Sequence, residues 1–143
     1  MTPDQLSSLS FGYLFGSDLI MWCPTQFLIS RYNVDNGSLQ EGVATAYSEV
    51  INQLATKYDI VGTLQMVSGP REPTLVKILA IMSVRNILGN MQNIGEKMQK
   101  DFDWADKTLL AIRNGQMNLI LSAAAFPMRS GSFLVGAKFG TIG

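Results

Sequence analysis

The chain has 143 residues, of which 47% are hydrophobic and 15% charged, with eleven basic and eleven acidic side chains. This length favours one compact domain, and the zero formal net charge excludes a protein that binds nucleic acid or anionic membranes through bulk charge. One cysteine and no histidine exclude an internal disulfide, ordinary zinc fingers and the usual catalytic triads. We therefore expect no enzyme, no catalytic residue, no metal site and no cofactor.

Targeting signals are not expected either. Asp4 stands where a signal peptide carries positive charge, and Asp18 and Pro24 interrupt the apolar stretch 11–29. No run reaches the roughly 18 to 20 apolar residues that span a bilayer. These features predict an intracellular, soluble protein without membrane association.

Residues 1–24 are an apolar extension whose only charges are Asp4 and Asp18. A helix through about Leu9 is predicted by a capping residue, an N1 proline and an acid in the first turn, namely Thr2, Pro3 and Asp4. The aromatic residues that follow either enter the core or face a partner: Phe11, Tyr13, Phe15 and Trp22. We expect Cys23 to be an inert buried thiol.

Two helices with a turn between them are predicted next. Thr25 is placed to cap a short helix that runs to Tyr32, and the Asn, Asp and Gly residues of 33–37 predict the turn. Ser38 and Glu41 then have the spacing of a capping box that opens a longer helix, ending near Tyr58. The apolar face of this helix repeats every three or four residues and comprises Val43, Tyr47, Val50, Ile51, Leu54 and Tyr58.

Residues 59–71 predict a loop with room for a short extended piece at 61–67, after which Pro73 opens another helix that Gly89 closes. The run 75–84 is apolar nearly all round and is interrupted only by lysine and serine. Such a helix must be covered on most sides, either by other helices of the chain or by neighbouring subunits.

The last long helix is predicted from about Gly95 to Asn114 and is closed by Gly115. Its packing seam alternates four and three residues and comprises Met98, Phe102, Ala105, Leu109 and Ile112. Trp104 lies off this seam and is either a second core contact or an intersubunit anchor. The aspartates and lysines of the helix are expected to form a solvated face.

The C-terminal segment 120–143 alternates apolar residues with glycine and serine, which suits an extended arm rather than a helix. The fold class is therefore all-α: a small bundle of about four to five helices with an apolar N-terminal extension and an extended C-terminal arm. Its expected parts are residues 1–24, 25–119 and 120–143.

Residues 25–119 resemble the small helical head-to-tail connector (adaptor, or head-completion) proteins of tailed bacteriophages. The resemblance depends on the order and separation of four stretches: Thr25–Gly37, Ser38–Tyr58, Pro73–Leu88, and the closing set Trp104, Ala105, Leu109, Ile112, Gly115 and Leu119. The N-terminal extension and the glycine-punctuated arm depart from the family's pattern.

This resemblance implies a virion structural protein that docks on the portal protein, bridges capsid and tail, and leaves a channel for DNA. It implies a ring of neighbouring copies, typically twelvefold, in the virion neck, with contacts to tail or other neck proteins and only transient, non-specific contact with passing DNA. Before assembly the subunit would reside in the host cytoplasm. No catalytic residue is implied.

The two apolar ends also suggest more hydrophobic surface than one copy can bury, so we expect them to contact partners. The expected interface residues in the C-terminal arm are Phe126, Met128, Arg129, Phe133, Leu134, Lys138 and Phe139. Those in the N-terminal extension are Phe11, Phe15 and Trp22.

Two other functions fit the same residues. One is a cytoplasmic helical module for protein–protein interaction that is not of viral origin. The other is a small enzyme or ligand-binding domain with a pocket under Trp22 or Trp104, which requires convergent polar groups of which the sequence has few.

Overall fold

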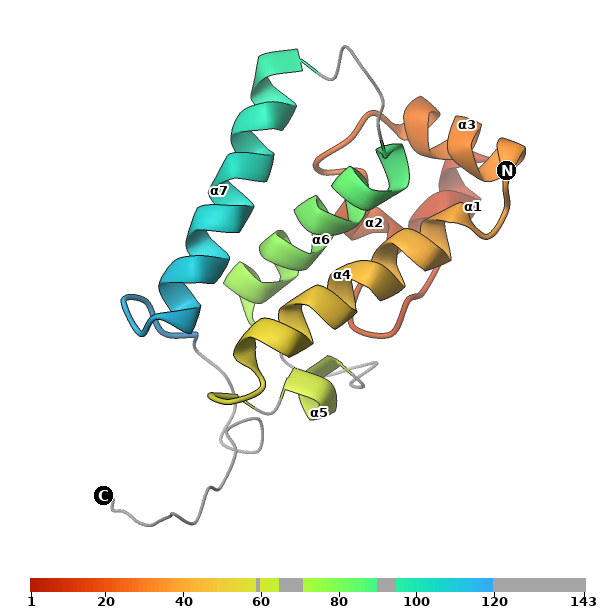
Figure 1. The fold of residues 1–143 in the computed structure, drawn as a ribbon. Coiled ribbons are helices and arrows are strands. Elements are labelled where there is room, and N and C mark those ends of the chain that lie inside the picture. Colours follow the sequence, from red (N-terminus) through yellow and green to blue (C-terminus); the bar gives the residue numbers. More distant parts are fainter. Residues whose placement is uncertain (59, 65–70, 90–94, 120–143) are drawn as a thin grey trace.

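The computed structural model describes residues 1–58, 60–64, 71–89 and 95–119 (Figure 1). These residues confirm the all-α fold, with four longer helices and three short ones, and their only β-feature is an isolated bridge between Ser10 and Phe15. The helices are α1 (Pro3–Ser8), α2 (Gly16–Leu19), α3 (Thr25–Val34), α4 (Ser38–Leu54), α5 (Ile60–Leu64), α6 (Pro73–Leu88) and α7 (Gly95–Arg113). The predicted C-terminal arm lies outside the described residues.

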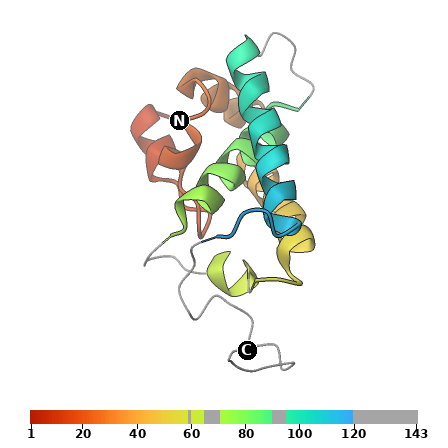
Figure 2. The same cartoon turned by 90° about the vertical axis from the view of Figure 1, so that its left-hand side faces the viewer.

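Helix α6 is the centre of the bundle, as its apolar sequence predicted. It contacts α2, α3, α4 and α7. In Figure 1 it lies between α4 and α7, and in both Figures 1 and 2 the helices α1–α3 gather at the end of the bundle away from α5. Its buried residues are Leu75, Ile78, Leu79, Ala80, Ile81, Met82, Ser83, Val84, Ile87 and Leu88. The chain's own helices therefore supply the cover that this helix requires.

The N-terminal segment 1–24 packs onto the bundle through its buried apolar residues. Its buried residues belong to the same core as those of α4, α6 and α7, and they are Leu6, Phe11, Tyr13, Leu14, Leu19 and Cys23. The predicted first helix is confirmed, because Thr2 accepts a hydrogen bond from the Gln5 amide and Pro3 stands at N1. The exposed apolar surface at this end is therefore smaller than predicted: Met21 stays exposed, and Phe15 and Trp22 are half-buried.

The starts of α3 and α4 differ from the predicted caps. Thr25 is the first helical residue of α3 and Pro24 occupies the cap position, with no side-chain hydrogen bond. Ser38 is likewise inside α4, and its hydroxyl donates to the Arg31 carbonyl oxygen at 3.2 Å instead of capping a helix. The turn between the helices is confirmed, with an Asp35 carboxylate oxygen accepting from the Gly37 amide at 3.0 Å.

Helix α4 buries the predicted apolar face only in part. Val43, Val50 and Leu54 are buried, Tyr47 and Ile51 are half-buried, and the regular helix ends at Leu54. Residues 60–64 form helix α5, so the extended piece expected from residue 61 is wrong over the described part of that segment.

Helix α7 confirms the predicted packing seam, since all five seam residues are buried. It ends at a left-handed Gly115 (φ 80°), where the amides of Gly115 and Gln116 bond back to the carbonyls of Ile112 and Ala111, the pattern of a Schellman cap. The chain then returns to the bundle, because the Leu119 amide donates to the Tyr58 hydroxyl.

Candidate functional site

The expected interface residues divide into two groups. The seven in the C-terminal arm lie outside the described residues, so they stay predictions. In the N-terminal segment, Phe11 is only 8% exposed and belongs to the core, whereas Phe15 and Trp22 are half-buried. An interface role for Phe11 does not fit this burial, and Phe15 and Trp22 are the two that reach the surface.

Buried polar contacts fix the N-terminal segment against α4 and α6. The Tyr13 hydroxyl accepts a hydrogen bond from the Glu72 amide at 2.6 Å, and the Tyr47 hydroxyl donates to the Phe11 carbonyl oxygen and accepts from the Leu14 amide. Burial raises the pKa of Tyr13 to about 12 and also raises the pKa of Tyr47. Both hydroxyls therefore stay neutral near pH 7 and serve as structural hydrogen-bonding groups.

An ion pair between Asp18 and Arg71 forms a further contact between the N-terminal segment and the start of α6. The Arg71 guanidinium lies 2.7 Å from a carboxylate oxygen of Asp18, whose side chain is 10% exposed, and the same oxygen accepts from the Phe15 amide. Arg71 also donates to the Tyr13 carbonyl oxygen and lies 5.3 Å from the centroid of the Phe15 ring. Because these contacts satisfy the nearly buried carboxylate, Asp18 is anchored and is not a free acid or base.

The two tryptophans meet through one lysine of α6. The Lys77 ammonium lies 4.0 Å from the ring centroid of Trp104 on α7 and 5.0 Å from that of Trp22, which follows α2. A cation over an aromatic face at these distances is electrostatically favourable. Trp104 therefore packs within its own chain, through α6, and the Trp22–Lys77–Trp104 cluster ties the N-terminal segment to the bundle.

An open, largely apolar pocket of about 460 Å³ lies beside Trp22. We call it the Trp22 pocket; its lining residues are Asp18, Met21, Trp22, Arg71, Pro73, Val76 and Lys77. Met21 is 69% exposed at its edge. The sequence left open a ligand pocket under Trp22, which requires convergent polar groups. The polar residues that line this pocket are the Asp18–Arg71 ion pair, whose carboxylate is already satisfied, and Lys77.

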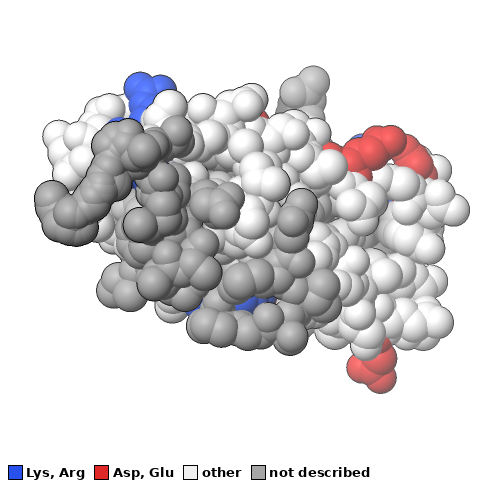
Figure 3. All heavy atoms as spheres, turned by 90° about the horizontal axis from the view of Figure 1, so that it is seen from below, with Lys and Arg blue, Asp and Glu red and all other residues white. Residues whose placement is uncertain are grey.

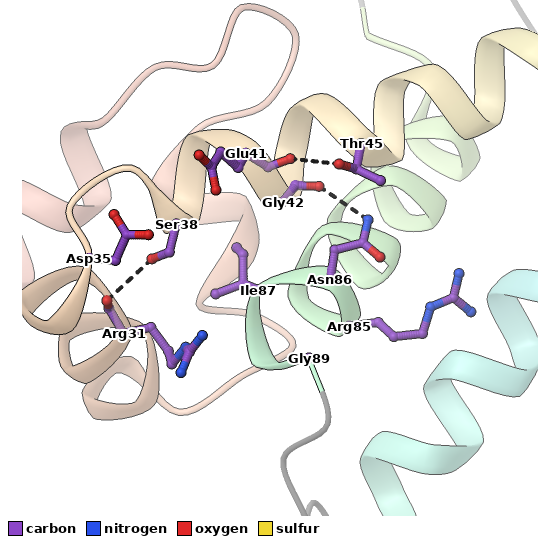
Figure 4. A pocket seen from close by; sticks show the side chains of 10 residues that line it. All are labelled: Arg31, Asp35, Ser38, Glu41, Gly42, Thr45, Arg85, Asn86, Ile87 and Gly89. Atoms are coloured by element: carbon purple, nitrogen blue, oxygen red, sulfur yellow. Dashed lines mark hydrogen bonds between the residues drawn. The ribbon is translucent and has the colours of Figure 1, made fainter.

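A second pocket, of about 530 Å³, lies where α3, α4 and α6 meet (Figure 4). Three of its side-chain donors are engaged by backbone carbonyls: Ser38 donates to Arg31, Thr45 to Glu41, and Asn86 to Gly42. The Arg85 guanidinium extends toward α7 and pairs with Asp106 at 2.9 Å. These polar groups stabilise the packing of the three helices, and they are not arranged as a nucleophile with a base.

The single cysteine is confirmed as a buried thiol. Cys23 is 4% exposed, and burial raises its pKa to about 11. At neutral pH it is a protonated thiol, which is a poor nucleophile and a poor metal ligand.

Neither a metal cluster nor a membrane span occurs in residues 1–58, 60–64, 71–89 and 95–119. Across these ranges no group of three or more histidine, cysteine, aspartate or glutamate side chains is arranged to hold a metal ion. None of the helices in the same ranges combines the length and apolar character of a membrane span.

Charged side chains are sparse on the face seen in Figure 3, over the part of it that belongs to described residues. Acidic atoms lie on the right of this view, and basic atoms are visible in separate places at its upper left and lower middle. Such a surface does not form a continuous basic track for nucleic acid.

The sequence did not reveal which residues lie next to Trp22 in the folded chain. In the sequence Lys77 only interrupts an apolar run, and the Asp18–Arg71 pair joins residues 53 positions apart. A lysine inside an otherwise apolar helix was the one available signal, because such a residue needs a partner for its charge. Comparisons with protein-family models, with curated proteins and with solved structures found no match for this chain.

Proposed function

We propose that this protein is a virion structural component: a head-to-tail connector subunit that docks on a portal ring and joins it to the tail. The observation that carries the proposal is the order of the long helices. Helices α3, α4 and α6 each begin at the first residue of one of the stretches that resemble the connector family and lie within it, and α7 with its Gly115 exit contains most of the fourth set.

The closed core supports a subunit that folds before it assembles. The described residues form one buried hydrophobic core within a single copy, so a single chain has a folded state to bring to a portal. Assembly contacts would then come from surface residues and from the C-terminal arm, in which Phe126, Phe133, Leu134 and Phe139 are the proposed anchors and Arg129 and Lys138 add positive charge.

The test is binding of the full chain to the portal protein of the genome that encodes it. Purified chain mixed with portal rings is expected to co-sediment with them and to add a ring of density, coaxial with the portal, in electron micrographs. A chain that remains free at concentrations saturating for other neck proteins would contradict the proposal, and a cytoplasmic interaction module would then be the better interpretation.

Deletion of residues 126–143 tests the arm within the same assay. The truncated chain is expected to keep its helical circular dichroism, because the core described up to Leu119 is closed by its own helices, while losing attachment to the portal. If the truncated chain unfolds, the arm belongs to the core; if it still binds, the interface lies elsewhere on the bundle.

A further inference from the structure

The Trp22 pocket combines apolar walls with unbalanced positive charge. Trp22, Val76 and Pro73 line it, and Met21 stands exposed at its edge. Its one carboxylate, on Asp18, is already held by Arg71 and by the Phe15 amide. No carboxylate among the described residues pairs with Lys77, whose ammonium lies against the two tryptophan rings.

A second cation, the Lys97 ammonium, adds positive charge near Trp22. The Lys97 ammonium on α7 lies 5.8 Å from the centroid of the Trp22 ring, and its side chain is 82% exposed. Lys97 is 3.5 Å from Asp101, a distance typical of a weak surface pair. A ligand in contact with Trp22 would therefore meet Lys77 in the pocket lining and have Lys97 on the Trp22 ring close by.

We propose that the Trp22 pocket is a docking site for an acidic segment of a partner protein, which inserts an apolar side chain against Trp22 and Val76 and places its carboxylates near Lys77 and Lys97. Met21 suits such a contact because a flexible thioether adapts to the shape of the inserted group. Carboxylates near a partly desolvated ammonium interact more strongly than they would in open solvent.

The charge of the pocket also argues against the C-terminal arm of a neighbouring copy as its occupant. The only charged side chains in residues 114–143 are Arg129 and Lys138, so an arm from a neighbouring copy would bring positively charged side chains toward two lysines. The arm is therefore a poor match for this pocket, and we assign the acidic segment to another protein. This docking site does not depend on the proposed connector role, and its test needs no portal.

The test uses synthetic peptides with the full-length chain. The first peptide carries a Leu-Phe pair flanked by aspartates and glutamates, the second replaces the acids with lysines, and the third keeps the acids but replaces the pair with glycines. Calorimetry at low salt is expected to show binding of the first peptide at least tenfold tighter than of the other two, with affinity falling as salt is raised. Equal binding of all three, or no binding of the first, would overturn the proposal.

Two matched variants locate the binding. Met21→Asp places negative charge at the pocket edge and is expected to weaken binding of the acidic peptide at least tenfold. Val34→Asp makes the same substitution at a residue that is 78% exposed on α3 and is expected to leave binding unchanged. Both side chains are exposed, so neither change should disturb folding, which circular dichroism checks. Equal losses in the two variants would overturn the assignment.

Lys77→Gln removes one positive charge from the pocket and keeps its apolar lining residues, so it tests the contribution of charge alone. The variant is expected to bind the acidic peptide about fivefold more weakly and to show a shallower salt dependence than the parent chain. Sedimentation of the parent and of Met21→Asp identifies a competing occupant. If Met21→Asp abolishes self-association of the parent chain while no peptide binds, the pocket holds a second copy and the proposal is wrong.

Discussion

Gly16 allows the N-terminal segment to fold back on itself. A Cβ atom at this position would lie 1.7 Å from the carbonyl oxygen of Leu6, an atom of the backbone that no side-chain rotation can move away. The Gly16 amide also donates to the Leu9 carbonyl oxygen at 2.8 Å. The close approach of α1 and α2 therefore requires glycine here.

Gly16→Ala is expected to lower the free energy of unfolding by about 3 kcal/mol, because α1 must shift away from α2 to admit a methyl group. Urea denaturation followed by circular dichroism measures the loss. Gly37→Ala is the matched control, since a Cβ there would meet its nearest neighbour, an Asp35 carboxylate oxygen, at an ordinary 3.5 Å. A loss no larger at Gly16 than at Gly37 would contradict the close approach of the two helices.

Cys23 makes the free energy of unfolding depend on pH in the alkaline range. Burial raises its pKa in the folded chain from the ordinary 9.0 to about 11. Between these values the unfolded chain has released the thiol proton and the folded chain retains it, so the free energy of unfolding falls as pH rises. Below about pH 9 the contribution is fully present.

In Cys23→Ala the fall in unfolding free energy between pH 9 and pH 11 is expected to be shallower, by up to about 1.4 kcal/mol per pH unit. Urea denaturation at a series of pH values measures both slopes. Tyr13, with its pKa raised to about 12, contributes in the same direction from about pH 10 and is common to both chains. Equal slopes in the two chains would show that the thiol is not shielded from solvent.

At the scale of single elements, α6 begins at a side-chain cap. Glu72 is 6% exposed, and its two carboxylate oxygens accept hydrogen bonds from the Thr74 and Leu75 amides at 3.0 and 3.2 Å. Pro73 occupies the next position, where its missing amide proton costs nothing. Glu72 is therefore the N-cap of the central helix.

Glu72→Ala is expected to lower the free energy of unfolding by about 1–2 kcal/mol, since two amides at the start of a central helix lose their acceptor. The matched control is Glu96→Ala, which removes an exposed acid from the first turn of α7. Thermal and urea unfolding of both variants compare the two positions. If the two substitutions cost the same, the carboxylate of Glu72 acts only through the helix dipole.

At the scale of the whole molecule, the N-terminal segment is part of the bundle. Helix α2 contacts α6, and α1 contacts α2 and α3, so residues 1–24 cover apolar surface that would otherwise face water. The Asp18–Arg71 ion pair and the Trp22–Lys77–Trp104 cluster hold the C-terminal end of this segment against the bundle. Its removal uncovers one side of the central helix.

Deletion of residues 1–24 is therefore expected to abolish cooperative unfolding and to produce a chain that aggregates or binds hydrophobic dyes. Thermal unfolding by circular dichroism, with dye fluorescence, gives the measurement. The reference is the 126–143 deletion, which removes nearly as many residues but none of the described core. A cooperative transition retained after removal of residues 1–24 would restore the view of this segment as a separable extension.

The amino-acid sequence alone determined the all-α class and the positions of the four longer helices, because apolar periodicity and the Pro73 and Gly115 signals act over a few neighbouring residues. Only the tertiary structure decided what covers α6 and where the N-terminal aromatic residues lie. Those outcomes depend on contacts such as Tyr13 with Glu72, which join residues 59 positions apart, and local patterns carry no record of such distant partners. The same holds for Trp22, which lines a pocket together with Val76 and Lys77, residues more than 50 positions away in the sequence.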